Sequence, residues 1–264
     1  MRRIIGSLMT AAGISLILFL GITYGPHILQ YWKAANEYQE IRDTAVTEQE
    51  LDSSLADWMK DLGIDPSKKL DVLDVDGKAL YEQNHDYIGW IYVPGTPISY
   101  PAVMSRDNSD YLHTGFDKGY LFSGTVFMDY RCTDGYLNRH SILYGHNMND
   151  GSMFASLNKF SDAAYFKEHP YFWFITQDYK LLYNIFSVTY PSPTDTLTYG
   201  VTYKDTADFL SCMQQIQDNS LVQTDYVLDD SDYVMTLSTC TGNSATRCTV
   251  HGVLLGAYKE KKGA

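Results

Sequence analysis

The order of hydrophobic and polar residues divides this chain into three parts. Residues 4–24 carry no charged side chain and follow two arginines. Residues 30–62 contain neither Gly nor Pro, and their apolar side chains recur at the spacing of a helix. From about residue 84 onward, short runs of β-branched and aromatic residues alternate with Gly, Pro, Asn and Asp. This order predicts an apolar N-terminal segment, a helical connection and a β-rich domain.

The apolar N-terminal segment is long enough to span a membrane. A helix formed by residues 4–24 extends over about 30 Å, which is the thickness of the hydrocarbon core. A cleaved signal peptide also begins with basic residues, but its apolar run is shorter and ends in a small-x-small site, which does not follow here. We therefore predict an uncleaved single-pass anchor in the cell membrane. Arg2 and Arg3 predict a cytoplasmic N-terminus and place the remainder outside the cell.

The region after the anchor is predicted to be helical. Leu51, Leu55, Trp58 and Leu62 recur at helical spacing, and Gly63 is a natural helix stop. One or two amphipathic helices would therefore join the anchor to the domain that follows.

The β-rich part of the chain predicts one closed barrel. Eight β-branched and aromatic runs lie between residues 84 and 258, which favours a mainly β, eight-stranded barrel over alternating β–α–β units. Two helical insertions interrupt the runs, at residues 151–160 and 204–217, and the second precedes the strand that carries Cys240. The predicted organisation is a cytoplasmic N-terminus with its anchor (residues 1–25), a helical linker (26–80) and the barrel (81–264).

The charge balance argues against nucleic acid as a partner. The chain has 20 basic and 32 acidic residues, so the part beyond Arg2 and Arg3 has 18 against 32 and a net charge of −14. The metal-ligand spacings C-x₂-C, H-x₃-H and H-E-x-x-H do not occur, and residues 71–77 lack the closing glutamate of a calcium loop. We expect neither a metal nor another cofactor.

Four cysteines in an exported chain could form two disulfides, but their spacing here is irregular, and a domain of this size does not need them to fold. We favour free thiols at Cys132, Cys212, Cys240 and Cys248. Cys212 and Cys248 are interpreted as small apolar core groups, and no role is assigned to Cys132.

Cys240 and Arg247 are the first candidates for chemistry. Cys240 ends the strand-like run YVMTLSTC, the next six residues, TGNSAT, form a turn, and Arg247 opens the following run. A hairpin of this length returns Arg247 to the neighbourhood of Cys240. The guanidinium cannot act as a base, but its fixed donors suit a developing oxyanion. Strand alternation sends Cys248 to the opposite face.

One of the seven histidines is placed as an acid or base would be. His146 directly follows the run SILYG and precedes NMNDG, so it lies at a polar strand exit, where functional groups gather. The others are interpreted as structural or surface residues: His27, His85, His113, His140, His169 and His251.

These residues resemble the sortases, the membrane-anchored cysteine transpeptidases of Gram-positive bacteria. TLSTC with an arginine shortly after it, and YGHNM upstream, carry the first likeness. Further motifs in the same order resemble the class B branch: residues 88–103, 127–131, 143–157 and 169–176, and the ending VHGVL. The likeness extends over roughly residues 80–260.

The resemblance implies a role for each matching residue. Cys240 would be the nucleophile, His146 the acid and base, and Arg247 the group that holds the substrate carbonyl and its oxyanion. Four further positions match the peptide groove of class B enzymes: Asn108, Leu112, Tyr144 and Ser238.

The resemblance also implies the reaction. The enzyme would cleave an LPxTG-like or NPxT-like C-terminal sorting signal after its threonine, through a thioacyl intermediate. It would then transfer the exported protein to an amine of a peptidoglycan precursor. The implied partners are sorting-signal peptides, the amine nucleophile and the membrane.

Three other functions remain open at this point. A pilus-polymerising sortase would use a pilin lysine as the amine. Cell-wall transpeptidases with a Gly-Cys-x-Arg run also use Cys, His and Arg, but six residues separate Cys240 from Arg247 here. A non-catalytic anchored surface protein would bury Cys240 as an unreactive thiol.

Overall fold

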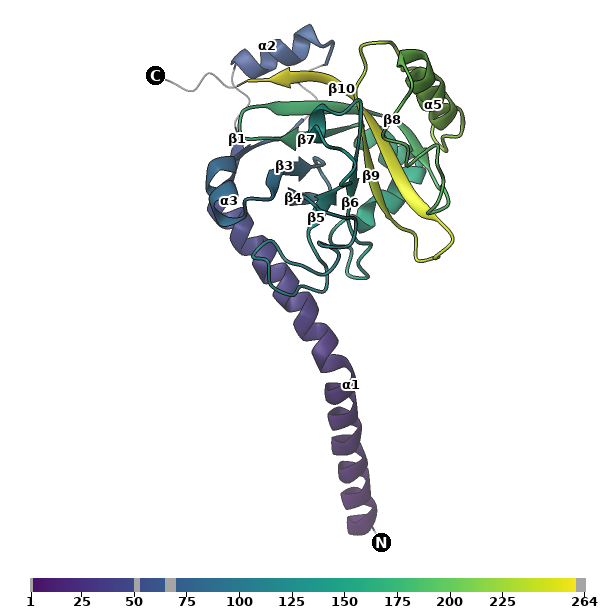
Figure 1. Cartoon of the computed structure of the whole chain (residues 1–264). Helices are drawn as coiled ribbons and strands as arrows, with labels where there is room; N and C mark the ends of the chain where they lie inside the picture. The colour runs from purple at the N-terminus through teal and green to yellow at the C-terminus, as the bar shows by residue number, and fades with distance from the viewer. Residues whose placement is uncertain (1, 50–52, 65–69, 260–264) are drawn as a thin grey trace.

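A computed structural model describes residues 2–49, 53–64 and 70–259 of the chain. Helix α1 (Arg2–Ala45) runs without a break through the apolar segment and beyond it. Its part Gly13–Ala45 is long and apolar enough to cross a membrane, with a mean hydropathy of 1.3 in its most apolar stretch, none of which is buried. Figure 1 shows this helix projecting away from the rest of the molecule. The structure therefore contains an exposed apolar helix at the position of the predicted anchor.

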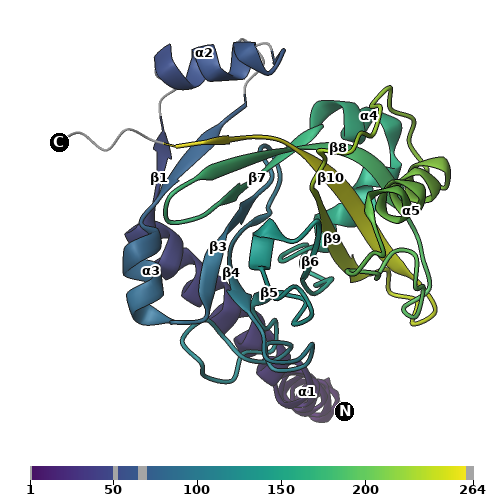
Figure 2. The ribbon, with the colours of Figure 1, turned by 45° about the horizontal axis from the view of Figure 1, so that its top comes forward.

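The C-terminal part of α1 packs against the folded domain. Ala34, Tyr38, Ile41 and Ala45 are buried, and their spacing puts them on one face of the helix. The Tyr38 hydroxyl donates a hydrogen bond to the carbonyl of Gly124. The helix that continues the apolar segment therefore contacts the domain directly. Figure 2 shows the domain in a view nearly along the axis of α1.

The predicted helix over residues 30–62 is wrong at one place. Strand β1 (Val46–Gln49) follows α1 directly and pairs antiparallel with β2 (Val72–Val75). Its first two residues, Val46 and Thr47, are β-branched and favour a strand when a partner strand is available.

The second half of that region is helical as predicted. Helix α2 (Ser53–Asp61) buries Leu55 and Met59, and Gly63 follows its end with a φ of +74°, a left-handed conformation that suits glycine. Leu51, which contributed to the predicted periodicity, lies outside the described residues.

Eight strands form a closed barrel, which confirms the predicted fold class. The strand order around it is β10-β8-β7-β3-β4-β5-β6-β9. Large aromatic side chains are buried against the barrel strands: Trp90 is fully buried, and Trp173, also fully buried, stacks on Trp58 from the helix α2. The strands are β3 (Tyr87–Tyr92), β4 (Ser99–Met104), β5 (Val126–Met128), β6 (His140–Tyr144), β7 (Tyr171–Ile175), β8 (Lys180–Thr189), β9 (Val234–Cys240) and β10 (Arg247–Tyr258).

Short helices occupy several connections of the barrel. The insertion predicted at residues 204–217 is α5 (Thr206–Asp218), capped by the Asp205 side chain. The insertion predicted at residues 151–160 begins later, because Met153 has a φ of 54° and pairs with Asn147 in a β-bridge. The remaining helices are α3 (Gly77–Gln83), η1 (Gly135–Leu137), η2 (Ala155–Ser161) and α4 (Ala163–Glu168).

One strand pairing determines which residues meet at the rim of the barrel. β6 and β9 run parallel, with Tyr144 opposite Ser238. Parallel strands end at the same edge, so the residues that follow β6 and those that end β9 emerge together. Two hydrogen bonds connect β6 and β9 at this edge. The Gly145 amide donates to the Ser238 carbonyl (3.1 Å), and the Thr239 hydroxyl donates to the Gly145 carbonyl (2.7 Å).

Candidate active site

The seven residues selected from the sequence line one cleft at this edge of the barrel. The cleft has a volume of about 320 Å³. Segments far apart in the chain contribute to it, from the β4–β5 connection, β5, the end of β6, the end of β9 and the start of β10. Its lining residues are Asn108, Leu112, Thr125, Phe127, Tyr144, Gly145, His146, Ser238, Thr239, Cys240 and Arg247.

Cys240 is the exposed thiol of the chain. It is the last residue of β9, and the six residues before it in that strand are buried. The four cysteines are free thiols, of which Cys132 and Cys248 are buried and Cys212 is half-buried. Burial raises the pKa of the Cys248 thiol to about 12, so at neutral pH that group stays protonated and unreactive. Exposure therefore distinguishes Cys240 from the other three thiols.

Arg247 lies directly opposite Cys240 in the antiparallel pairing of β9 and β10. Directly opposed residues point to the same face of a sheet, with their Cβ atoms about 5 Å apart. The Arg247 Nη1 donates to the carbonyls of Thr246 (3.1 Å) and Ser244 (3.4 Å). Among the described residues, both hydrogen bonds of the Arg247 side chain are made by Nη1. The N–H groups of Nε and Nη2 therefore remain available to a ligand in the cleft.

The six-residue loop that joins Cys240 and Arg247 is stabilised by a glycine with positive φ and by a hydrogen bond across the loop. Gly242 adopts a φ of +85°, which glycine tolerates. The hydroxyl groups of Thr241 and Thr246 are hydrogen-bonded to each other at 2.7 Å across the loop. These contacts hold the end of β9 and the start of β10 together.

His146 follows β6 after a single glycine. Its Nε2 donates to the Leu112 carbonyl at 2.7 Å, which places the proton on Nε2 and leaves Nδ1 as the basic nitrogen of the neutral ring. The ring stacks on His113, with centroids 5.4 Å apart and planes 17° apart. Burial lowers the pKa of His146 below its ordinary value, and the neighbouring His113 lowers it further.

Gly145 is required by the packing beneath His146. A Cβ placed on Gly145 would lie 2.7 Å from the Phe154 ring, inside van der Waals contact. The strand exit that carries the imidazole therefore runs directly over an aromatic side chain.

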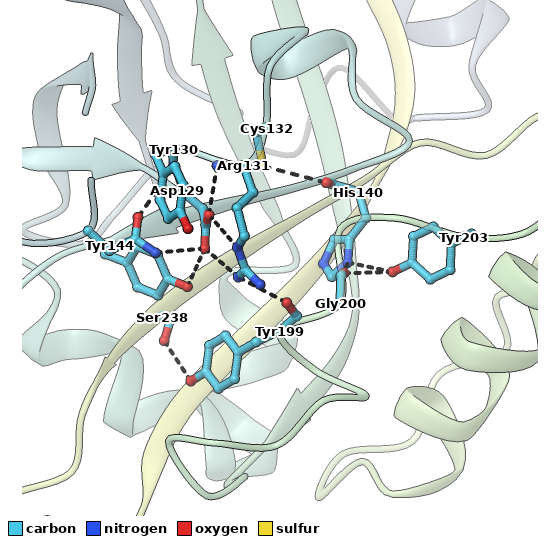
Figure 3. Close-up of polar contacts among 11 residues, drawn as sticks. Asp129, Tyr130, Arg131, Cys132, His140, Tyr144, Tyr199, Gly200, Tyr203 and Ser238 are labelled. Carbon is cyan, nitrogen blue, oxygen red and sulfur yellow. Dashed lines mark hydrogen bonds and ion pairs between the residues drawn. The ribbon is translucent and has the colours of Figure 1, made fainter. Parts of the chain in front are cut away.

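A second hollow adjoins this cleft and shares four of its residues. It has a volume of about 600 Å³, and the connection between β8 and α5 forms its far wall. Tyr199 from this connection stacks on Tyr144, with ring centroids 6.2 Å apart, and its hydroxyl is hydrogen-bonded to Ser238 Oγ at 3.1 Å (Figure 3). The two hollows together form an extended groove.

The sequence did not single out His113, Asp129, Arg131 and Tyr199 as site residues. Asp129 and Arg131 had one available signal, which is a carboxylate and an arginine two residues apart directly after a buried strand. Tyr199 had none, because its place depends on the fold of the connection before α5.

Two histidines interpreted as structural are buried on strands β6 and β10, beside the connection that precedes α5. His140 and His251 are fully buried and joined through the Thr236 hydroxyl, at 2.7 Å and 2.8 Å. Burial lowers the pKa of His140 to about 4 and that of His251 to about 3. Both rings are therefore neutral at physiological pH.

Comparison with known proteins identifies the relatives of this barrel. A model of the sortase domain matches residues 91–255. Sortase B of Listeria monocytogenes is 31% identical over 225 residues, which cover 83% of this chain and 87% of that protein. The structure of sortase B from B. anthracis superposes with a TM-score of 0.70 at 28% identity, over 88% of this chain and 100% of that one. A Staphylococcus aureus sortase B–substrate complex, 22% identical, has the same fold, with a TM-score of 0.69 over 88% of this chain and 99% of that one.

These matches define the protein as a cysteine transpeptidase, and the chain belongs to the sortase family. Its relatives and structural neighbours are class B sortases. The resemblance found in the sequence is thereby confirmed. The apolar N-terminal helix fits a membrane-bound member of this family.

Proposed function

We propose that Cys240 is the nucleophile that cleaves an LPxTG-like or NPxT-like C-terminal sorting signal after its threonine. The thiolate attacks the threonine carbonyl, the bond from that carbon to the next nitrogen breaks, and the acyl group remains on sulfur as a thioester. One observation carries the proposal: the exposed thiol of the chain lies opposite Arg247 in a cleft that His146 also lines.

His146 exchanges the protons that this reaction requires. As imidazolium it gives a proton to the departing amine, and as neutral imidazole it accepts one from the incoming amine. The Leu112 carbonyl supports this role, because it fixes which nitrogen keeps its proton in the neutral ring. The lowered pKa of His146 makes the imidazolium a stronger acid toward the leaving amine.

Arg247 stabilises the negative charge that develops on the threonine carbonyl oxygen. Its charge is permanent, and Nε and Nη2 keep N–H donors for that oxygen. Strand pairing fixes the Arg247 backbone, and the Nη1 bonds to the Thr246 and Ser244 carbonyls hold its guanidinium, so its donors are in place before the charge forms.

The groove beside these residues holds the peptide. We assign this binding to Asn108, Leu112, Tyr144 and Ser238, all of which line the cleft with Cys240. Leu112 contributes an apolar surface and the other three contribute hydrogen-bonding groups.

The acceptor is an amine of a peptidoglycan precursor. We place the N-terminus in the cytoplasm and the catalytic domain (residues 81–264) outside the cell, held at the membrane by α1. Exported substrates and lipid-linked precursors share that surface, which raises the encounter rate between the acyl-enzyme and its acceptor.

The test combines donor peptides with competing acceptors. The full chain in detergent micelles is incubated with an LPxTG-like or an NPxT-like peptide, together with triglycine, a diaminopimelate-containing peptide or a pilin-type lysine peptide. Mass spectrometry then identifies the joined product, with Cys240→Ala as the control. A product with a peptidoglycan-type amine supports the proposal. A product with the lysine peptide alone would favour pilus polymerisation instead, and no product with any combination would remove the proposed substrate class.

A further inference from the structure

A fully buried carboxylate accepts hydrogen bonds from three side chains that line the groove. Asp129 directly follows β5 and has no exposed side-chain surface. Its Oδ1 accepts from the backbone N (3.0 Å) and Nε (2.9 Å) of Arg131. Its Oδ2 accepts from Arg131 Nη2 (2.7 Å), Asn108 Nδ2 (3.0 Å) and the Tyr144 hydroxyl (2.9 Å), as Figure 3 shows for Arg131 and Tyr144. Burial alone would raise the pKa of Asp129, but these hydrogen bonds hold it below its ordinary value, so the group is ionised.

The ionised carboxylate fixes the direction of the Tyr144 hydrogen bond. A carboxylate has no proton to give, so the Tyr144 hydroxyl must donate its single proton to Asp129. Toward the cleft, the Tyr144 oxygen then offers only lone pairs. A ligand can therefore donate a hydrogen bond to Tyr144 but cannot accept one from it.

The orientation of the Asn108 amide is fixed from two sides. Its Oδ1 accepts from the backbone N–H of Tyr130 at 3.1 Å, and its Nδ2 donates to Asp129 at 3.0 Å. An N–H on one side and a carboxylate on the other admit only one orientation of the amide. The second Nδ2 proton remains as a donor, and Asn108 lines the same cleft as Tyr144.

Arg131 extends the network to the opposite wall. While it is paired with Asp129, its Nη2 also donates to the Tyr199 carbonyl at 3.0 Å. The adjacent carbonyl, that of Gly200, is bonded to Nδ1 of the buried His140 at 2.7 Å. The connection that carries Tyr199 is thus held at two consecutive carbonyls, and Figure 3 shows both contacts.

We propose that Asp129 is a positioning residue that sets the hydrogen-bond polarity of the groove, with an acceptor at Tyr144 and a donor at Asn108. This inference rests on the proposed function and deepens it. The matching ligand is an extended peptide segment that presents one backbone N–H to Tyr144 and one carbonyl or carboxamide oxygen to Asn108.

The test measures which backbone N–H of the peptide the protein requires. Fluorescein-labelled sorting peptides of both classes are prepared in which one amide N–H at a time is replaced by an ester oxygen. Their binding to the full chain with Cys240→Ala is measured by anisotropy in detergent micelles. We expect one ester position to weaken binding by about tenfold. Adding Tyr144→Phe should weaken binding of the parent peptide by a similar factor and reduce the ester penalty at that position to less than about twofold.

Asp129→Asn tests the carboxylate itself. An amide offers one acceptor oxygen where the carboxylate offers two, so Tyr144 is freed to donate and the same ester penalty should again fall below about twofold. Asp232→Asn is the matched control, because Asp232 is also buried, accepts a tyrosine hydroxyl (Tyr226, 2.7 Å) and lies outside both hollows. This control should keep the ester profile of the unsubstituted protein.

Each outcome decides between named alternatives. A flat ester profile in the unsubstituted groove, or an unchanged ester penalty in either Asp129→Asn or Tyr144→Phe, would overturn the inference while peptide binding upheld the proposed function. Loss of the ester penalty in Asp232→Asn as well would mean that general loosening, not polarity, is responsible. If no sorting peptide binds the chain or acylates it, the proposed function fails and this inference fails with it.

Discussion

Arg247 stands directly opposite Cys240 across the β9–β10 hairpin, so the register of one strand pair fixes the cation beside the exposed thiol. The relationship needs no long-range folding event, because only six residues separate the two. An arginine at this place could have either of two functions, and the reactions of Cys240 that each would affect are different. A cation that activated the thiol itself would affect all reactions of Cys240, whereas an oxyanion donor affects only acyl transfer.

Replacement of Arg247 should therefore slow acyl transfer but leave the rate of Cys240 alkylation nearly unchanged. We expect Arg247→Gln to reduce kcat/KM for a sorting peptide by about 10² to 10³, the usual loss for one oxyanion donor. Arg247→Lys should recover part of this, because it keeps the charge but loses the planar fork. Peptide turnover and the rate of Cys240 alkylation by iodoacetamide are measured on the same samples. A parallel collapse of both rates would show that Arg247 acts through the thiol instead.

The stacking of His113 on His146 predicts a pH effect with a definite sign. Burial lowers the pKa of His146, and the charge of His113 lowers it further. His113→Phe keeps an aromatic ring against His146 but removes the charge, so the pKa of His146 should rise. The ring C–H signals in an NMR titration report this pKa, and the limb of the kcat/KM profile that belongs to His146 should move to higher pH with it. An unchanged His146 titration in this variant would exclude coupling between the two rings.

The two buried histidines, His140 and His251, predict acid sensitivity of the fold. The pKa of His140 is lowered to about 4 and that of His251 to about 3, so the unfolded chain binds more protons than the folded one below pH 6.5. Stability should fall as the pH drops from about 6.5 toward 4, by up to about 3 kcal/mol for His140. Thermal unfolding between pH 7 and 4.5 measures the slope. His140→Gln should make that slope shallower even though the variant is less stable at pH 7, and an unaltered slope would contradict the assignment.

Gly145→Ala should damage the site more than the fold. The added methyl group would meet the Phe154 ring at 2.7 Å, which forces the segment before His146 to shift. We expect a loss of about 1–3 kcal/mol in unfolding free energy and at least a tenfold loss in kcat/KM. The double variant with Phe154→Leu makes room for the methyl group and should restore part of the activity. Full activity in the single variant would mean that the position of His146 tolerates the shift.

The sequence predicted what depends on local pattern and on short hairpins. Strand patterning predicted the eight-stranded barrel, Gly63 predicted the end of α2, and a six-residue turn predicted that Arg247 returns to Cys240. Helical spacing was misleading at Val46–Gln49, where pairing with a strand 23 or more residues later outweighs the local preference.

The rest of the site depends on pairings that no local pattern encodes. His146 reaches the cleft because β6 lies parallel to β9, although the paired residues Ile142 and Thr236 are 94 positions apart in the chain. Asp129 and Tyr199 join the groove through side-chain contacts over 15 and 39 residues. Such contacts become visible only when the barrel has been closed.

The most direct measurement of the central claim is the intact mass of the full chain after incubation with sorting-signal peptides, with Cys240→Ala alongside. The account predicts a mass increase equal to the acyl fragment that ends in threonine, on the unsubstituted chain alone, and its release on addition of an amine or hydroxylamine. The contradictory result is the absence of any adduct combined with a Cys240 that iodoacetamide does not modify, because the thiol would then be neither accessible nor nucleophilic.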